Sequence, residues 1–307
     1  MSRKPIDPRN DPDVPQGMSI DLLKDLHLLT REGQLNADAR RKLKQIRHFV
    51  GLLRPALDDV YQRHVDPTIV DCGAGKSYLG FLLYELVIGP ATRGRLVSVE
   101  SRPELVEGAA SRASRFGHAR FRFEKTDIAS ASTAPPLAQT HIVTALHACD
   151  TATDDALTLG IRSGADYIAV VPCCQAEIAR QLAERPGEER LGAETSGDGA
   201  APDGDESPET GRAGEQDLAL IRHPLHRREF GSHLTNVIRG LCLEARGYKV
   251  TVTELVGWEH SLKNELILAK RVRRENRQAQ ATLAGLLTRW NVRPSLVQQL
   301  EASGPLR

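Results

Sequence analysis

Short apolar runs alternate with amphipathic, helix-length stretches from about residue 67 onward. This alternation is typical of a parallel β-sheet whose two faces are covered by helices. The pattern predicts strands at residues 68–71, 95–99, 120–124, 141–146, 166–171, 249–255 and 265–270. Helices fit between them at residues 77–87, 103–116, 152–162 and 175–184. We therefore expect an α/β fold with a doubly wound sheet.

A helical extension, residues 18–66, is expected before this sheet. One helix covers residues 22–29, and a second begins at Asn36, because asparagine is a good N-cap. Pro55 should kink the second helix or start a new one. Apolar residues recur every three or four positions along it and predict one buried stripe: Leu43, Ile46, Val50, Leu53, Leu57 and Val60. The opposite face fits either a solvated surface or an RNA contact, and it carries Arg40, Arg41, Lys44 and Arg47.

Three segments have a composition that differs from the core. Residues 1–17 carry four prolines and six charged side chains, which predicts a disordered tail. Residues 185–216 hold nine acidic residues and almost nothing apolar, so we expect a disordered acidic insertion within a core domain at 67–272. Residues 273–307 predict a C-terminal helical tail of one or two small helices.

Composition narrows the function classes. The 307 residues are 40% hydrophobic and 26% charged with a net charge of +1, which is an ordinary globular balance. This balance gives no global signal for nucleic-acid binding and none for DNA specificity. The five cysteines lack the spacing of a disulfide scaffold, and the chain shows no signal peptide and no long apolar run. We expect a cytoplasmic protein without a membrane partner.

The strongest chemical signal is the stretch TIVDCGAGKSYLG, in which a strand ends at Asp71 and a glycine turn opens a helix. Glycines let the backbone approach a ligand closely, and the helix N-terminus adds oriented amides. A P-loop would need a glycine at position 70, but this chain has Val70 there. A dinucleotide-binding fingerprint would need a third glycine at position 78, but this chain has Tyr78 there. Both phosphate-binding motifs, and with them a nucleotide hydrolase, are excluded on spacing.

Two further acids follow at strand ends. Glu100 ends the second strand, where a carboxylate can accept both ribose hydroxyl protons. Asp127 follows the third strand, where a carboxylate could hold an adenine amino group. A single acid in a loop is more often only solvated. An acid that leads straight into a glycine turn resembles motif one of class I methyltransferases, and together with the two further acids it indicates a site for S-adenosylmethionine (SAM).

Four stretches resemble class I SAM-dependent methyltransferases of a branch with Pro-Cys-Cys after strand five. They are ARRKLKQIRHFVGLL, DCGAGKSYLGFLLYEL, ALHACDTATDDAL and VVPCCQAEIA. HPLHRREFGSHLTNVIR and WEHSLKNELILA look like further family stretches. The resemblance implies a Rossmann-like sheet of seven strands, the last antiparallel, with SAM as cofactor. It implies these cofactor-binding residues: Asp71, Gly73, Ala74, Gly75, Ser77, Tyr78, Glu100, Ser101, Asp127, Ile128 and His147.

The acceptor side should form where strands four and five end, because ligands of open α/β sheets bind beyond the carboxyl ends of the strands. His147 and Asp150 are candidate bases, although Asp150 could instead cap the helix that follows. Cys173 and Cys174 could line the pocket, act as nucleophiles, or bind zinc with Cys149 and nearby histidines. Without a CxxC pair we expect no metal. Later segments could add His223, His226, Arg227, His233, His260, Lys263 and Asn264.

The acceptor itself is expected to be RNA, because of the basic helix face and the run RVRRENR at 271–277. One departure bears on the methylated atom. Many class I enzymes that methylate amino groups carry Asp/Asn-Pro-Pro-Tyr after strand four, whereas this chain reads His147-Ala148-Cys149-Asp150. Methylation of a small molecule or a protein is the closest rival, and a SAM-binding scaffold without turnover is another.

Overall fold

The computed structural model describes residues 7–132, 137, 139–146, 148–184, 213–255, 264–272 and 275–302. The chain divides into two compact units. The first unit comprises residues 1–173 and 249–271, and the second comprises residues 174–248 and 272–307. None of the helices in these described ranges combines the length and the apolarity that crossing a membrane requires.

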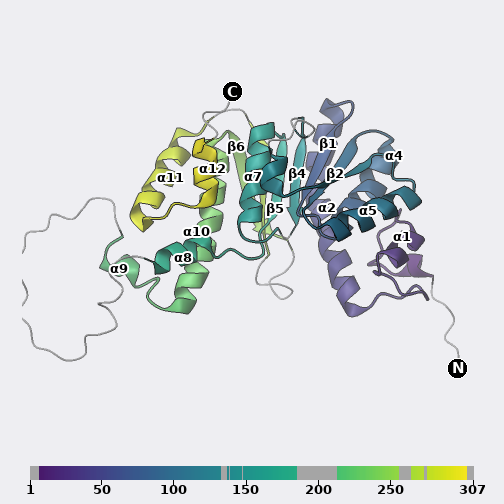
Figure 1. The fold of residues 1–307 in the computed structure, drawn as a ribbon, viewed down its shortest axis with the longest axis horizontal. Coiled ribbons are helices and arrows are strands. Elements are labelled where there is room, and N and C mark those ends of the chain that lie inside the picture. The colour runs from purple at the N-terminus through teal and green to yellow at the C-terminus, as the bar shows by residue number, and fades with distance from the viewer. Residues whose placement is uncertain are drawn as a thin grey trace, which may run out of the picture. The chain divides into compact units, whose positions relative to one another are not determined.

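The first unit is built on a seven-stranded sheet in the order β3-β2-β1-β4-β5-β7-β6. Figure 1 shows β1, β2, β4 and β5 side by side. Every strand boundary lies within one residue of its prediction. The strands are β1 (Thr68–Cys72), β2 (Arg95–Glu100), β3 (Phe121–Lys125), β4 (Ile142–Leu146), β5 (Tyr167–Val171), β6 (Tyr248–Glu254) and β7 (Glu265–Arg271).

The direction of the strands confirms the expected Rossmann-like class I topology. β1 to β5 pair in parallel, and β7 pairs antiparallel with β5. The chain winds outward from β1 to β3 and then returns, so that β4 lies on the other side of β1. This reversal is the switch point of an open sheet, and ligands bind there beyond the carboxyl ends of the strands.

Helices cover both faces of the sheet. Successive residues of the central strands point to opposite faces, and most of them are apolar, so both faces need to be covered. The helices of the first unit are α1 (Ile20–Asp25), α2 (Ala37–Arg63), α3 (Tyr78–Leu83), the π-helical turn η2 (Tyr84–Ile88), α4 (Gly89–Ala91), α5 (Pro103–Arg115), α6 (Ile128–Ala131) and α7 (Thr151–Ser163). Ile69, Leu96 and Ile142 belong to the core that also holds residues of α1, α2, α3 and α5. Val143 and Ile168 lie against Gly160 of α7, which has no side chain to separate the helix from the strands.

The long helix α2 precedes the sheet in the chain. The Asn36 side chain accepts a 2.8 Å hydrogen bond from the amide of Ala39 and so caps the helix. The helix continues through Pro55 rather than beginning anew there. Its predicted apolar stripe is buried.

Residues 7–17 were expected in a disordered tail, but the structure gives them the short 3-10 helix η1 (Pro8–Asn10) and contacts with α2. Arg40 of α2 binds the carboxylates of Asp11 and Asp13, and Val14 is buried. These ion pairs and the apolar anchor are the physical reason for the difference. Residues 1–6 of the expected tail lie outside the described residues.

The second unit is helical. It holds α8 (Glu177–Ala183), α9 (Glu215–Leu218), α10 (Pro224–Ala245), α11 (Arg277–Trp290) and α12 (Ser295–Ala302). Because Gly231 of α10 has no side chain, the backbone of Ala179 in α8 can pack directly against it. Glu177 accepts 2.8 Å hydrogen bonds from the amide and hydroxyl of Ser295, which ties α8 to the start of α12. The expected C-terminal tail is thus part of a packed unit. Most of the expected acidic insertion, residues 185–212, lies outside the described residues.

Candidate functional site

The loop between β1 and α3 has a left-handed backbone at three positions. Gly73 has φ +64° and Gly75 has φ +57°, and the N-cap Ser77 has φ +56°. Glycine adopts this region without the strain that a side chain brings. The amides of Gly73 and Ala74 both donate to the carbonyl of Val99, at 2.9 and 3.2 Å, so the loop is fastened to the end of β2.

The same loop is joined to Glu100, the last residue of β2. The amide of Gly75 donates a 2.8 Å hydrogen bond to Oε2 of Glu100, whose side chain is almost fully buried. Arg102 also donates to this carboxylate, from its amide at 3.1 Å and from Nε at 2.9 Å. Burial alone would raise the pKa of Glu100, but the hydrogen bonds from Arg102 and Gly75 bring the pKa below its usual value. Glu100 is therefore a charged acceptor beside bare backbone.

Asp71 lies at the carboxyl end of β1 and is fully buried. Thr144 Oγ1 of β4 donates a 3.0 Å hydrogen bond to its Oδ1. Burial raises the pKa of Asp71 to about 7, while the bond from Thr144 acts in the opposite direction. A carboxyl group with this pKa becomes charged most readily when a cation lies beside it.

A hollow of about 150 Å³ opens next to Asp71, at the switch point of the sheet. The loop and strand side of its wall consists of Asp71, Ala74, Tyr78, Leu79 and Leu146. The opposite wall is supplied by α2 and consists of Lys42, Gln45 and Ile46. Lys42 Nζ donates a 2.7 Å hydrogen bond to Asp38, which raises the pKa of Lys42.

Sequence reasoning missed Lys42 and Gln45. The sequence does place these two residues on the predicted helix, where they flank the buried stripe at Ile46. The spacing of the apolar residues along a helix predicts that their stripe faces the core. Which other element of the sheet it meets depends on tertiary packing.

Asp127, expected to hold the adenine amino group, and Ile128, expected to bind the cofactor, lie at the start of α6. The carboxylate of Asp127 accepts hydrogen bonds from the amide and hydroxyl of Ser130, at 2.8 and 2.9 Å, and caps that helix. These bonds lower the pKa of Asp127, which remains exposed. Ile128 is buried, and its Cδ1 lies 3.9 Å from where a Cβ on Gly73 would be. Ser101 is exposed in the turn after Glu100.

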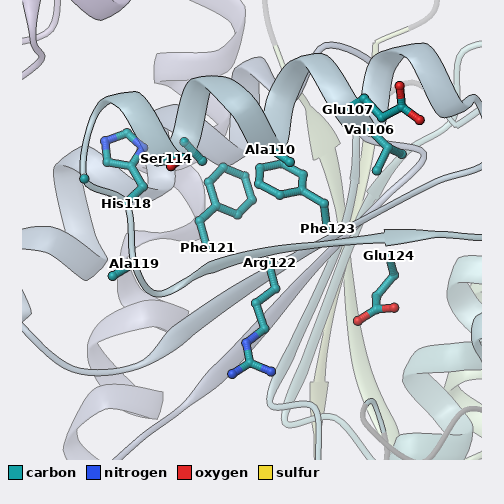
Figure 2. A pocket seen from close by; sticks show the side chains of 12 residues that line it. Val106, Glu107, Ala110, Ser114, His118, Ala119, Phe121, Arg122, Phe123 and Glu124 are labelled. Carbon is teal, nitrogen blue, oxygen red and sulfur yellow. The ribbon is translucent and has the colours of Figure 1, made fainter.

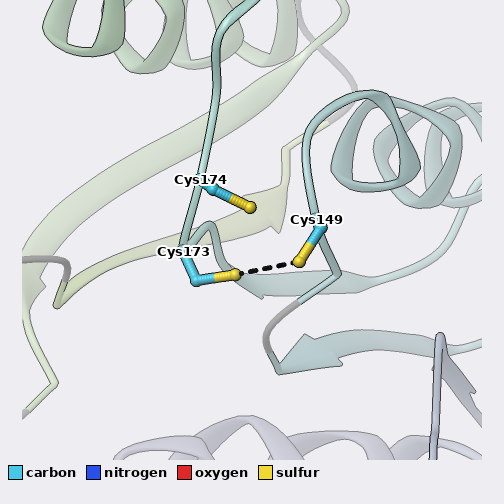
Figure 3. A group of neighbouring side chains, drawn as sticks. All are labelled: Cys149, Cys173 and Cys174. Atoms are coloured by element: carbon cyan, nitrogen blue, oxygen red, sulfur yellow. Dashed lines mark hydrogen bonds between the residues drawn. The ribbon is translucent and has the colours of Figure 1, made fainter.

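The segments after β4 and β5 lie together, as expected for neighbouring parallel strands. Asp150 occupies the N-cap position of α7 with φ +49°, but its side chain makes no capping hydrogen bond. Sγ of Cys149 lies 3.4 Å from Sγ of Cys173, and Cys174 follows by one peptide bond (Figure 3). His147 lies outside the described residues.

Other predicted polar residues fall in separate places. His223, His226, Arg227 and His233 are on or beside α10 of the second unit. The rings of His223 and His226 are 5.4 Å apart. Asn264 is buried next to β7, and its carbonyl accepts a 2.7 Å bond from the amide of Leu255. His260 and Lys263 lie outside the described residues. Cys72 and Cys242 are buried.

A second, larger hollow of about 620 Å³ lies between α5 and the edge strand β3. Figure 2 shows Phe121 and Phe123 pointing toward α5, whereas Arg122 and Glu124 point away from it. None of the residues that line this hollow is among the predicted site residues. Four of the predicted site residues, Asp71, Glu100, Asp150 and Cys173, lie instead at or just after the carboxyl ends of β1, β2, β4 and β5.

Comparison with known proteins bears on the identity of the chain. Residues 41–181 match a family model described as a methyltransferase domain. No curated protein matches the chain. Similar solved structures include the S-adenosylhomocysteine-bound methyltransferase PaMTH1 of Podospora anserina, with 12% identity, coverage of 84% of this chain and 88% of that chain, and a TM-score of 0.43.

Two further similar structures are a methyltransferase of Geobacter sulfurreducens and an rRNA methylase of Streptococcus thermophilus. The first has 14% identity over 84% of this chain and 92% of that chain, with a TM-score of 0.38. The second has 9% identity over 68% and 88%, with a TM-score of 0.36. TM-scores this low carry no argument about this chain, so the conclusion comes from the family match and the observed strand order. The chain carries a class I methyltransferase domain, and it is a methyltransferase that uses S-adenosylmethionine.

Proposed function

We propose that SAM binds along the β1–α3 loop, with its ribose at Glu100 and its methionine end in the hollow beside Asp71. The observation that carries this proposal is the buried, charged carboxylate of Glu100 held against the amide of Gly75. Both ribose hydroxyls can donate to such an acceptor, and they would replace the hydrogen bonds from Arg102. The left-handed turn at Gly73 and Gly75 leaves bare backbone against which the nucleoside can lie.

The polar wall of the hollow suits the charged end of SAM. Asp71 would gain a cation beside it, since SAM carries a sulfonium and an α-ammonium group. Lys42 of α2 supports binding of the α-carboxylate from the opposite wall. Ala74, Ser77 and Tyr78 would complete this end, while Ser101, Asp127 and Ile128 would contact the adenosine end. His147 is proposed at the same edge on its sequence position alone.

Methyl transfer is an in-line displacement in which an acceptor lone pair attacks the methyl carbon while its bond to sulfur breaks. The sulfonium leaves as a neutral thioether, and an acceptor that bears a proton must lose it. The enzyme mainly aligns the reactants and excludes water. We propose Asp150 and His147 as the groups that accept the proton. Cys173 and Cys174 are candidates for the wall of the acceptor site.

We propose RNA as the acceptor. Three arginines occur within seven positions around the start of α10: Arg222, Arg227 and Arg228. Arginine forks match phosphate oxygens, and such contacts supply most of the affinity for a nucleic acid. On α2, Arg40 is bound by Asp11 and Asp13, whereas Arg41, Lys44 and Arg47 of the predicted basic face are exposed. Arg228 of α10 likewise pairs with Glu229, at 2.8 Å, so the support for RNA comes from the cations of both helices.

The acceptor class can be tested with labelled SAM and a cell extract fractionated into RNA, protein and small molecules. Label in the RNA fraction supports the proposal. Label only in protein or in a metabolite would identify the rival acceptor. Absence of transfer to every fraction, with SAM binding intact, would favour a SAM-binding scaffold.

RNA retention over a salt series gives a second, independent test. For single strands the slope of log affinity against log salt is about 0.7 per phosphate contact. The double variant Arg222→Ala with Arg228→Ala should therefore lower the slope by about 1.4. A matched double variant, Arg31→Ala with Arg54→Ala, should keep the wild-type slope. Equal slopes for all three proteins would contradict a role of α10 in RNA binding.

A further inference from the structure

Three thiols converge where β4 and β5 end. Leu146 and Val171, the last residues of these parallel strands, are directly paired. Cys149 stands three residues after Leu146, and Cys173 and Cys174 stand two and three residues after Val171. The two segments leave the sheet at the same level and on the same edge, so their side chains meet. The three sulfurs all lie within 4.8 Å of one another.

The directions of the side chains agree with these distances. Figure 3 shows the three sulfurs turned toward one space, with the closest approach between Cys149 and Cys173. Cys174 is fixed relative to Cys173 by the peptide bond that joins them. The cluster is therefore set by the strand register and by the chain itself.

Packing alone does not explain these cysteines. A thiol that serves only as a small apolar group is normally buried, as Cys72 and Cys242 are here. Cys149 is exposed, and Cys173 and Cys174 are only partly buried. Three accessible thiols that lie this close together could bind one metal ion as a group.

The spacing also fits a tetrahedral ion. A Zn–S bond of about 2.3 Å with tetrahedral angles places two sulfurs about 3.8 Å apart. The 3.4 Å separation of Cys149 and Cys173, and the 4.8 Å limit for the whole group, lie on either side of this value. Small rotations about the Cα–Cβ bonds would bring all three sulfurs to equal distances from one ion.

We propose that Cys149, Cys173 and Cys174 form a three-thiolate site for a borderline or soft cation, with Zn²⁺ as the expected ion. Thiolates select such ions over Mg²⁺ and Ca²⁺, which prefer oxygen ligands. Three protein ligands leave the fourth position of a tetrahedral ion to water or to an atom of a substrate. The site lies at the edge of the sheet where an acceptor is expected, and it does not depend on the proposed SAM contacts.

The test uses the full chain, reduced and freed of metal with a chelator, and titrated with Co²⁺. One Co²⁺ per chain should bind, with the thiolate charge-transfer band and the visible bands of a tetrahedral ion, and Zn²⁺ should displace it. Each of Cys149→Ser, Cys173→Ser and Cys174→Ser should weaken binding by more than about 100-fold, because even second-shell changes cost 10- to 100-fold. Cys242→Ala, outside the cluster, should bind like the wild type. No stoichiometric binding, or unchanged binding in the three serine variants, would overturn the proposal.

Thiol alkylation of the wild-type protein avoids any dependence on how the variants fold. Zn²⁺ should slow the labelling of the three clustered cysteines at least about 10-fold, as read by mass spectrometry of their peptides. Cys72 and Cys242 should stay unlabelled with or without Zn²⁺, because they are buried. Labelling that Zn²⁺ does not change would overturn the metal site. The Glu100→Gln variant should keep this protection, which separates the metal site from SAM binding.

Discussion

The amide of Gly75 donates a 2.8 Å hydrogen bond to the carboxylate of Glu100, which follows 25 residues later. This bond links the glycine turn after β1 to the end of β2, the strand beside it. The carboxylate thereby orients the loop and is itself held in its charged form. A nucleoside placed here would meet bare backbone and a charged acceptor together.

Glu100→Gln should weaken SAM binding by about 10- to 100-fold, because hydrogen bonds to a charged group contribute about 1.5–3 kcal/mol. The glutamine oxygen can still accept from Gly75, so the loop should keep its shape. Calorimetric titration with SAM measures the change. Glu107→Gln, an exposed glutamate on α5, is the matched control and should bind as the wild type does. Equal affinities of the Glu100 variant and the wild type would show that the ribose lies elsewhere.

Asp71→Asn should stabilise the protein more at pH 8 than at pH 5. The folded-state pKa of Asp71 is raised to about 7, so the folded protein holds a proton that the unfolded chain loses at about pH 4. Its stabilising contribution is complete below the unfolded pKa and is lost as pH rises toward 7, by up to about 1.4 kcal/mol per pH unit. Urea unfolding of wild type and variant at both pH values measures this. A stability difference independent of pH would contradict the burial of an uncharged Asp71.

Two helix glycines should respond oppositely to alanine. A Cβ on Gly160 of α7 would lie 2.5 Å from Cδ1 of Ile168, whereas a Cβ on Gly108 of α5 would meet nothing within 4 Å. Gly160→Ala should lower the melting temperature, since overpacking costs about 1–3 kcal/mol. Gly108→Ala should raise it, by up to about 1 kcal/mol of helix propensity. Thermal unfolding followed by circular dichroism compares the two. A stable Gly160→Ala variant would mean that α7 does not pack closely on the sheet.

Asp150→Asn should leave SAM affinity within about twofold of wild type and should slow methyl transfer by about 100-fold or more, the usual contribution of a general base. The reason is that Asp150 lies at the start of α7, just after the end of β4, at the edge of the sheet where an acceptor is expected. Single-turnover transfer from labelled SAM measures the rate. Asp58→Asn, an exposed position on α2, is the control. Unchanged turnover would exclude Asp150 as the base.

The strands could be predicted closely because each is a short apolar run between polar turns, and every boundary came within one residue. The helix predicted at residues 77–87 was only partly correct, because Tyr84–Ile88 forms a π-helical turn. The spacing of apolar residues does not distinguish such a turn from an α-helix. Composition alone suggested a tail at residues 7–17, but Val14 is buried and Arg40 is positioned to bind two of its acids.

The parts of the candidate site that are formed by neighbouring residues in the chain could be predicted. The parts that depend on contacts between distant segments could not. The turn at Gly73 and Gly75 could be predicted from the glycines that follow a strand. The wall at Lys42 and Gln45 depends on how α2 docks. Asp127 shows a local competition, because Ser130 three residues later lets the carboxylate cap a helix. The thiol cluster needed the register of β4 and β5, which spacing along the chain does not specify.

The most direct test of the SAM site is a crystal structure of the protein grown with S-adenosylhomocysteine. The account predicts the ribose hydroxyls within hydrogen-bond distance of Glu100, the nucleoside along the turn at Gly73 and Gly75, and Arg102 displaced from the carboxylate. Crystals that show the nucleoside bound away from Glu100, or protein that does not bind it at millimolar concentration, would contradict the account.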